Sequence, residues 1–105
     1  MSDVALLWVT FASRAEAERV AETVLAERLA ACANILNGCT SIYRWQGEVH
    51  RGEEVPALFK TTPMLARRLR DRIAALHGYE LPVIETWPAA AGDAVYAWVS
   101  AETGA

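Results

Sequence analysis

The stretch from Asn34 to Thr62 most constrains the fold, because it contains two long extended runs joined at Gln46-Gly47. This pair suits a two-residue hairpin turn, since glycine adopts a positive φ at little cost. If the run from Asn34 to Trp45 is one strand, it spans about 40 Å. A globular domain of this length has a radius of gyration of only about 13 Å. We therefore expect the hairpin to project beyond its own domain and to contact a partner subunit.

The position of the turn also sets the pairing of the two runs. The expected pairs are Trp45 with Glu48, Tyr43 with His50, and Cys39 with Glu54. Pro56 has no N–H for a ladder, and Gly38, which almost faces it, tolerates a bend. We therefore expect the long strands to be interrupted there, giving two ladders joined by a bend. Tyr43 and Trp45, near the tip, are expected to make contacts between subunits.

The remaining segments alternate between strand and helix patterns. The apolar run from Val4 to Thr10 predicts a buried strand. A capping box at Ser13 and Glu16 starts an amphipathic helix, which we expect to run to about Ala31. Three further elements are expected. The first is a helix from Thr62 as N-cap to His77, with Gly78 left-handed after it. The second is a strand from Leu81 to Trp87, followed by a loop after Pro88. The third is a helix from Asp93 to Ser100, with Tyr96 facing the body and a frayed tail at 101–105.

This order of elements predicts an α+β fold. Strand, helix, strand, strand, helix, strand is the ferredoxin-like split βαβ pattern, here with a C-terminal helix and a long hairpin between the second and third strands. The length predicts one domain, residues 1–105. Because such folds host many functions, the function must be argued from particular residues.

Composition excludes some classes of partner. A net charge of -3 and a pI near 5.3 argue against a nucleic-acid binder, which needs surplus basic groups. No run is long and apolar enough to span a bilayer, and membrane attraction is unsupported. The apolar fraction of 53% is high for so small a domain, which fits surface hidden between subunits. Cys32 and Cys39 form no CxxC motif, so we expect a reduced pair in a cytoplasmic protein.

A metal site is the first candidate chemistry. The soft ligands are His77, His50, Cys32 and Cys39, and their spacing matches no preassembled tetrahedral site. His77 can also be explained by its place at a helix C-terminus, where an imidazolium complements the helix dipole. A site built from several subunits would need only one ligand from each chain.

A lone cation is the second candidate. Lys60 is the only lysine, and it could serve an anionic ligand or form an ion pair with a carboxylate such as Glu80. The arginines between 67 and 72 are better explained as a solvated helix face. No nucleophile motif, Gly-rich phosphate loop or acid–base pair is present, so we predict that the protein is not an enzyme. The RNP1 pattern of RNA-binding domains is also missing.

A set of spaced motifs covering nearly the whole chain resembles the CutA family. The matching residues are Arg28 to Ile35, Gly38, Ser41-Ile42-Tyr43, Trp45-x-Gly47, Glu54, Lys60-Thr61-Thr62, His77 to Pro82, Pro88, Gly92 and Tyr96. The resemblance implies a ferredoxin-like protomer in a compact homotrimer, similar to the PII signalling proteins, with hairpins packed across subunit boundaries. It also implies a role in tolerance of divalent cations, copper in particular, with metal binding in some members.

The chain departs from this family at positions that matter for copper. Some copper-binding relatives have a cysteine where this chain has Val9, and a second histidine where it has Leu76. His77 is what remains of that ligand set. Gly78 stands where the family usually has proline.

Taken together, the residues and the resemblance predict a cytoplasmic homotrimer implicated in divalent-metal tolerance. We expect a ligand, such as Cu(II) or a small anion, to lie between subunits near Lys60, Tyr79 and Glu80, with His77 as the candidate metal ligand. The alternative is a PII-like signalling or scaffold trimer that acts through protein contacts.

Overall fold

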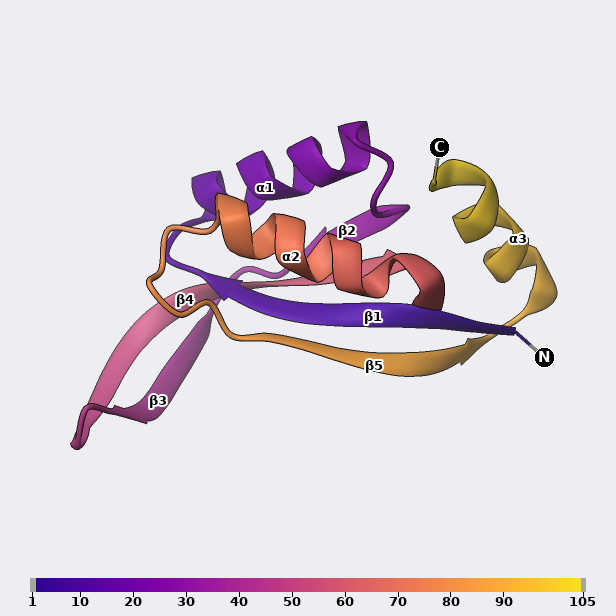
Figure 1. Ribbon diagram of the computed structural model, residues 1–105. Coiled ribbons are helices and arrows are strands. Elements are labelled where there is room, and N and C mark those ends of the chain that lie inside the picture. The colour runs from indigo at the N-terminus through magenta and orange to yellow at the C-terminus, as the bar shows by residue number, and fades with distance from the viewer. Residues whose placement is uncertain (1, 105) are drawn as a thin grey trace.

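The computed structural model describes residues 2–104. Its strands form one antiparallel sheet in the order β2-β4-β1-β5, and β3 pairs with β4 alone (Figure 1). The elements are β1 (Ser2–Phe11), α1 (Arg14–Ala26), β2 (Cys32–Ile35), β3 (Cys39–Trp45), β4 (Glu48–Thr61), a 3-10 turn (Pro63–Leu65), α2 (Ala66–Leu76), β5 (Ile84–Ala91) and α3 (Asp93–Glu102). With β2 and β3 counted as one broken strand, this is the expected split βαβ order plus a terminal helix.

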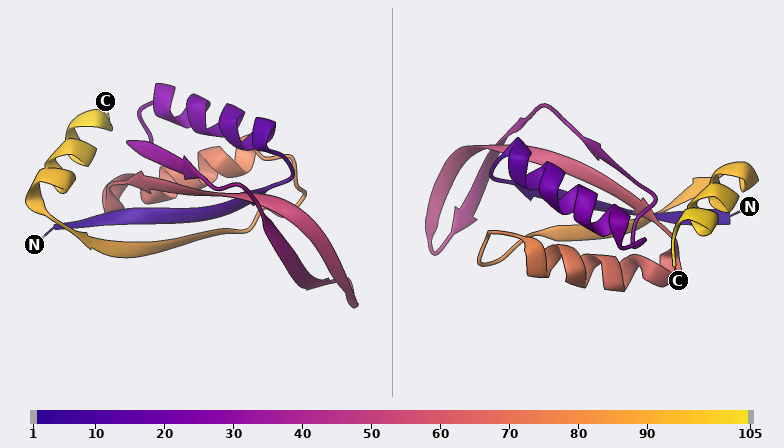
Figure 2. Two further views of the ribbon diagram at one scale, coloured as in Figure 1. Left: turned by 180° about the vertical axis from the view of Figure 1, so that it is seen from behind. Right: turned by 90° about the horizontal axis from the view of Figure 1, so that it is seen from above.

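The core lies between the sheet and the helices α1 and α2, which cover one face of it (Figures 1 and 2). Side chains alternate between the faces of a strand, so every second residue of β1 points toward these helices. Leu7, Val9 and Phe11 of β1 are fully buried there, and Phe59 of β4 joins them. The side chains of Leu6, Trp8, Leu58 and Trp87 point the other way and stay partly exposed.

The interruption of the hairpin is confirmed on one strand only. The chain leaves strand conformation at Leu36 to Gly38, between β2 and β3, whereas β4 continues through Pro56. The Leu36 N–H donates to the Pro56 carbonyl at 3.0 Å, but Pro56 has no N–H to return to the Leu36 carbonyl. That carbonyl instead accepts from Arg14 Nη1, weakly, at 3.5 Å. The β2–β4 ladder therefore ends at this proline.

The register of the hairpin and its projection are both confirmed. The structure pairs Trp45 with Glu48, Tyr43 with His50, and Cys39 with Glu54. Both turn residues have positive φ, 51° at Gln46 and 82° at Gly47. The molecule measures 44 × 25 × 23 Å with a radius of gyration of 14.3 Å, and the long dimension includes the projecting tip (Figure 1).

Helix α1 ends earlier than expected, at Ala26 rather than about Ala31. Arg28 adopts φ 61°, its N–H donates to Leu25 O, and the Leu29 N–H donates to Val24 O. These are the two bonds of a Schellman motif, which usually has glycine at the left-handed position. The arginine is held by its side chain, which donates to the Gly104 and Ala101 carbonyls at 2.9 Å each.

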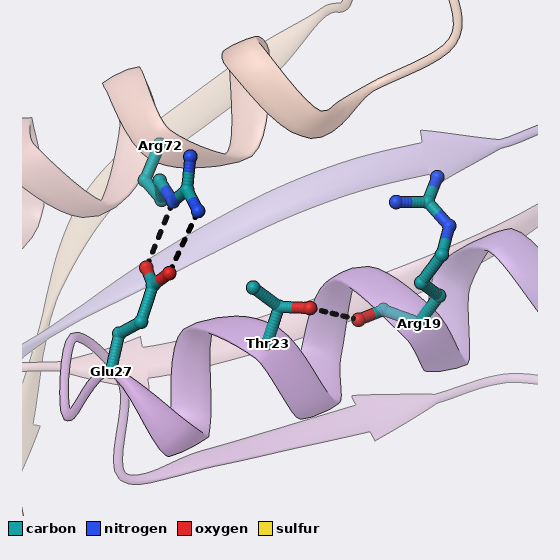
Figure 3. A network of polar contacts seen from close by, with 4 residues as sticks. All are labelled: Arg19, Thr23, Glu27 and Arg72. Carbon is teal, nitrogen blue, oxygen red and sulfur yellow. Dashed lines mark hydrogen bonds and ion pairs between the residues drawn. The ribbon is translucent and has the colours of Figure 1, made fainter.

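The end of α1 is also tied to α2. The Arg72 guanidinium donates two hydrogen bonds to the Glu27 carboxylate, at 2.9 and 2.7 Å, in the bidentate geometry that Figure 3 shows. One turn earlier, the Thr23 hydroxyl donates to the Arg19 carbonyl at 2.8 Å (Figure 3). Both partners of the ion pair are exposed, so solvent screening keeps its contribution to stability small.

The expectation that Gly78 is left-handed was wrong. His77 is the C-cap of α2 with φ -76° and ψ 144°, and the positive-φ glycines are Gly47 and Gly104. The chain leaves the helix in an extended conformation. A Cβ at Gly78 would lie 2.7 Å from Glu16 Oε2, so any larger residue would require the Glu16 carboxylate to move.

The C-terminal elements also differ from expectation. The fourth strand of the pattern, β5, begins at Ile84 rather than Leu81 and runs through Pro88 to Ala91, which an edge strand allows. Tyr96 is partly exposed, and Val99 is the buried residue of α3. The expected fraying does not occur at residues 101–104, because Arg28 binds this end and Thr103 is buried. Ala105 lies outside the described residues.

Arg28 gives a test of this account of the α1–α3 junction. Arg28→Ala loses the side-chain bonds and keeps the strained φ, whereas Arg28→Gly loses the bonds but relieves the strain. We expect both variants to lower the free energy of unfolding, with Arg28→Ala lower by about 1 kcal/mol. Urea unfolding followed by circular dichroism measures this difference. Equal losses in the two variants would show that the positive φ carries no cost.

Candidate functional site

The candidate site lies where three parts of the chain meet: the end of β1, the loop 77–83 after α2, and the point where the hairpin leaves the domain. Glu16, in the first turn of α1, joins the end of β1 to this loop. Its Oε1 accepts from the Ala12 N–H at 3.2 Å, and its Oε2 accepts from the Gly78 N–H at 2.7 Å. The expected N-cap is confirmed, since Ser13 Oγ accepts from the Glu16 N–H at 3.2 Å. One side chain thus joins the start of α1 to the loop.

His77 is buried in this junction and uses both ring nitrogens. Nδ1 accepts from the Tyr79 N–H at 3.1 Å, so the ring proton is on Nε2, which donates to the Thr10 carbonyl at 2.8 Å. The imidazole stacks on Phe11 with ring centroids 4.7 Å apart, and the Tyr79 ring lies at the same distance, tilted by 50°. These contacts fix the ring in one tautomer and one orientation.

The Tyr79 hydroxyl joins the loop to the hairpin by donating to Glu54 Oε2 at 2.7 Å. Partial burial pushes the pKa of Glu54 upward, but hydrogen bonds from the hydroxyls of Ser41, Tyr79 and Thr10 outweigh it, so the pKa falls below 4.5. Burial, and then the adjacent Glu54 carboxylate, raise the pKa of Tyr79 well above 10.0. The pair is therefore an ionised carboxylate and a neutral phenol at neutral pH.

A metal ion does not fit His77 as this protomer holds it. Both nitrogens already have hydrogen-bond partners, and residues 2–104 contain no group of three or more His, Cys, Asp or Glu side chains that could hold a metal ion. Val9 lies in the hydrophobic core, and Leu76 packs against it. Cys32 and Cys39 are free thiols. The assignment of His77 as a metal ligand stays a prediction.

The structure does not bring Lys60 to the loop that carries Tyr79 and Glu80. Lys60 pairs with Leu6 and Cys32 in the sheet, whereas the loop lies beside Thr10, which pairs with Pro56. Lys60 and Pro56 are four positions apart along β4, which corresponds to about 13 Å. No ion pair between Lys60 and Glu80 occurs among residues 2–104. Within one chain, these three residues do not form one site.

Tyr43 and Trp45, the predicted interface residues, lie on the projecting hairpin and remain about half and two-fifths exposed. Tyr43 stacks on His50 with ring centroids 5.5 Å apart. One surface hollow, of about 510 Å³, lies near the other end of the sheet. It is lined by Ser2, Asp3, Thr62, Pro63, Met64 and Tyr96. None of the predicted site residues lines it.

The sequence did not reveal that Glu54 and Thr10 belong to the site, or that Glu16 binds the Gly78 N–H as well as capping its own helix. The register already placed Glu54 on the hairpin opposite Cys39, and the capping box already identified Glu16. Neither pattern could indicate that a loop 25 or 62 residues further along the chain would contact these carboxylates.

The lowered pKa of Glu54 predicts a dependence of stability on acid. A carboxyl whose pKa falls on folding stabilises the protein above its unfolded pKa, and this contribution is lost as pH falls through the folded value. We therefore expect the free energy of unfolding to fall less between pH 6 and pH 3 in Glu54→Gln than in the unaltered chain. Urea titrations at each pH measure it. Glu53→Gln, which removes a carboxylate that Tyr79 does not contact, controls for the loss of one charge. A parent-like acid dependence in Glu54→Gln would contradict the assignment.

Comparison with known proteins places this geometry in a family. The family model of the CutA1 divalent ion tolerance protein matches residues 5–102. The chain is 44% identical to the divalent-cation tolerance protein CutA of Thermus thermophilus, over 99% of this chain and 100% of that protein. It is 39% identical to CutA of Salmonella newport, over 88% of this chain and 81% of that protein.

Solved structures agree with the sequence comparison. The crystal structure of CutA1 from Ehrlichia chaffeensis superposes with a TM-score of 0.91 at 35% identity, covering 100% of this chain and 99% of that one. A relative from Archaeoglobus fulgidus, described as a periplasmic divalent cation tolerance protein, gives a TM-score of 0.89 at 30% identity, covering 94% of this chain and 97% of that one. None of these names states a catalytic activity. From the match along nearly all of its length, the chain belongs to the CutA1 divalent ion tolerance protein family.

Proposed function

We propose that this protein acts in divalent-cation tolerance as a homotrimer whose projecting hairpins pack across subunit boundaries. The observation that carries the proposal is the apolar surface of the hairpin. Ile42 and Val49 are each 63% exposed, Tyr43 is 51% exposed, and Trp45 lies beside them. A monomer rarely leaves so much apolar surface in water on a ribbon with nothing packed against it. The partly exposed Leu6, Trp8, Leu58 and Trp87 on the sheet support the same proposal.

The ligand site of this trimer would lie between subunits. Lys60 and the pair Tyr79-Glu80 are separated within one chain, so a single ligand can meet them all only where two chains contribute. We favour an anion over a metal ion, because Lys60 can donate to an anion whereas both nitrogens of His77 are engaged.

A PII-like signalling or scaffold trimer remains the second candidate, because the same exposed hairpin could carry a protein partner. The cytoplasmic location also stays a prediction. None of the helices in the described residues is long and apolar enough to cross a membrane.

Light scattering tests the assembly. We expect a particle of about 34 kDa, three times the 11.5 kDa chain. In Tyr43→Ala/Trp45→Ala, we expect the midpoint concentration for assembly to rise at least tenfold, because aromatic anchors dominate interfaces. Leu25→Ala, which trims a partly exposed side chain on α1, is the control and should assemble as the parent does. A stable monomer of the unaltered chain at micromolar concentration would overturn the trimer.

Calorimetry with Cu(II) tests the metal assignment. Because His77 would have to release the Tyr79 N–H to bind a metal, we expect equal heats from the unaltered chain and from His77→Gln, whose amide can still donate and accept. One copper site per chain that is lost in His77→Gln would instead establish His77 as a ligand.

A further inference from the structure

The projecting arm, defined here as residues 39–54, is joined to the domain in an unusual way. It consists of β3 and the first half of β4, which pair only with each other. The pairing of β4 with β1 begins at Val55, and its pairing with β2 ends at Ala57. The arm therefore continues from the sheet through one strand, β4, as Figures 1 and 2 show.

β3, the other strand of the arm, is not continuous with the sheet at the base of the arm. Leu36 to Gly38 form neither strand nor helix. With one of its two strands irregular at the base, the arm can change direction without breaking a pair of ladder bonds. Something other than the sheet must then fix its direction.

In the part of the chain that the structure describes, one side-chain hydrogen bond joins the domain to the arm, and its acceptor is Glu54. The Tyr79 hydroxyl donates to Glu54 Oε2 at 2.7 Å. Elsewhere the arm's side chains bond within the arm. Thr40 donates to Glu53 and Arg44 donates to the Gly47 carbonyl.

The loop that holds Glu54 is itself fixed to the domain. Gly78 donates to Glu16 on α1, and Tyr79 donates its N–H to His77, whose ring is stacked on Phe11. The Tyr79 hydroxyl is thus a rigidly mounted donor. It can hold the arm in one direction because its own position is fixed from two sides.

We propose that Glu54 and Tyr79 form a latch that sets the direction of the arm, and that a ligand which takes the Tyr79 hydroxyl from Glu54 frees the arm. This rests on the proposed function, in which the arm carries the subunit contacts and the ligand binds beside Tyr79. It adds a coupling between ligand binding and the direction of the arm, because the Glu54 carboxylate belongs to the arm and its donor, Tyr79, belongs to the loop 77–83. Ligand affinity and subunit contact would then change together, as linkage requires.

Distance measurements between two spin labels test the latch. The labels are placed at Glu48→Cys near the arm tip and Glu22→Cys on α1, in a Cys32→Ser/Cys39→Ser background. Labelled chains are diluted with unlabelled chains so that distances within one protomer dominate. We expect one narrow distance in the parent. We expect at least a twofold broader distribution in Tyr79→Phe, which removes the donor, and in Glu54→Ala, which removes the acceptor.

Tyr96→Phe is the matched control, because it removes a tyrosine hydroxyl on α3, away from the arm and from the loop that carries Tyr79. It should keep the narrow distance. Tyr79→Phe retains the aromatic ring against His77, so it is expected to fold even if Glu54→Ala does not. A parent-like distribution in Tyr79→Phe, or in folded Glu54→Ala, overturns the latch.

The result separates the latch from the trimer. Light scattering on the same samples gives the oligomeric state, whereas the label distance reports the arm direction within one chain. A monomer with a narrow distance that broadens in Tyr79→Phe would refute the trimer and keep the latch as the device that orients the arm. A trimer whose distance stays narrow in Tyr79→Phe would refute the latch and keep the trimer.

Discussion

The missing N–H of Pro56 is the constraint on which the shape of this protein depends. β4 passes through this residue without a break and keeps its pairing with β1, but it cannot complete the bond pair with Leu36. The neighbouring strand therefore stops and re-forms only at Cys39, where it can pair with β4 alone. One absent donor thus divides a continuous hairpin into a part that belongs to the core and a part that extends into solvent.

The features predicted correctly from the sequence are the ones that depend on neighbouring residues. The Gln46-Gly47 turn fixed the register of the arm, and the Ser13 cap fixed the start of α1. The end of α1 was missed because Arg28, not a glycine, takes the left-handed position. It can do so because its side chain binds carbonyls more than 70 residues away. The run of β5 through Pro88 was missed because only the sheet shows that β5 is an edge strand.

The sequence named some residues of the candidate site, but it could not predict how they are arranged. Family resemblance identified His77, Tyr79 and Lys60, yet the fold separates Lys60 from the other two and gives both nitrogens of His77 to hydrogen bonds. The hydroxyl of Tyr79 donates a hydrogen bond to Glu54, and this pairing depends on where the loop and the arm meet in space. Spacing along the chain carries no information about such contacts, which is why a motif can place a family member without placing its ligand.

The close approach of Gly78 to Glu16 has a thermodynamic consequence. The Gly78 N–H donates to Glu16 Oε2 at 2.7 Å, a bond that a proline at this position could not make. Proline restrains a loop by reducing the freedom of the unfolded chain, whereas glycine increases that freedom and must recover it through contacts in the folded state. This chain therefore holds its loop by a contact in the folded state, whereas a proline would hold it by restricting the unfolded chain. The order of this loop consequently depends on the position of the Glu16 side chain rather than on the stiffness of its own backbone.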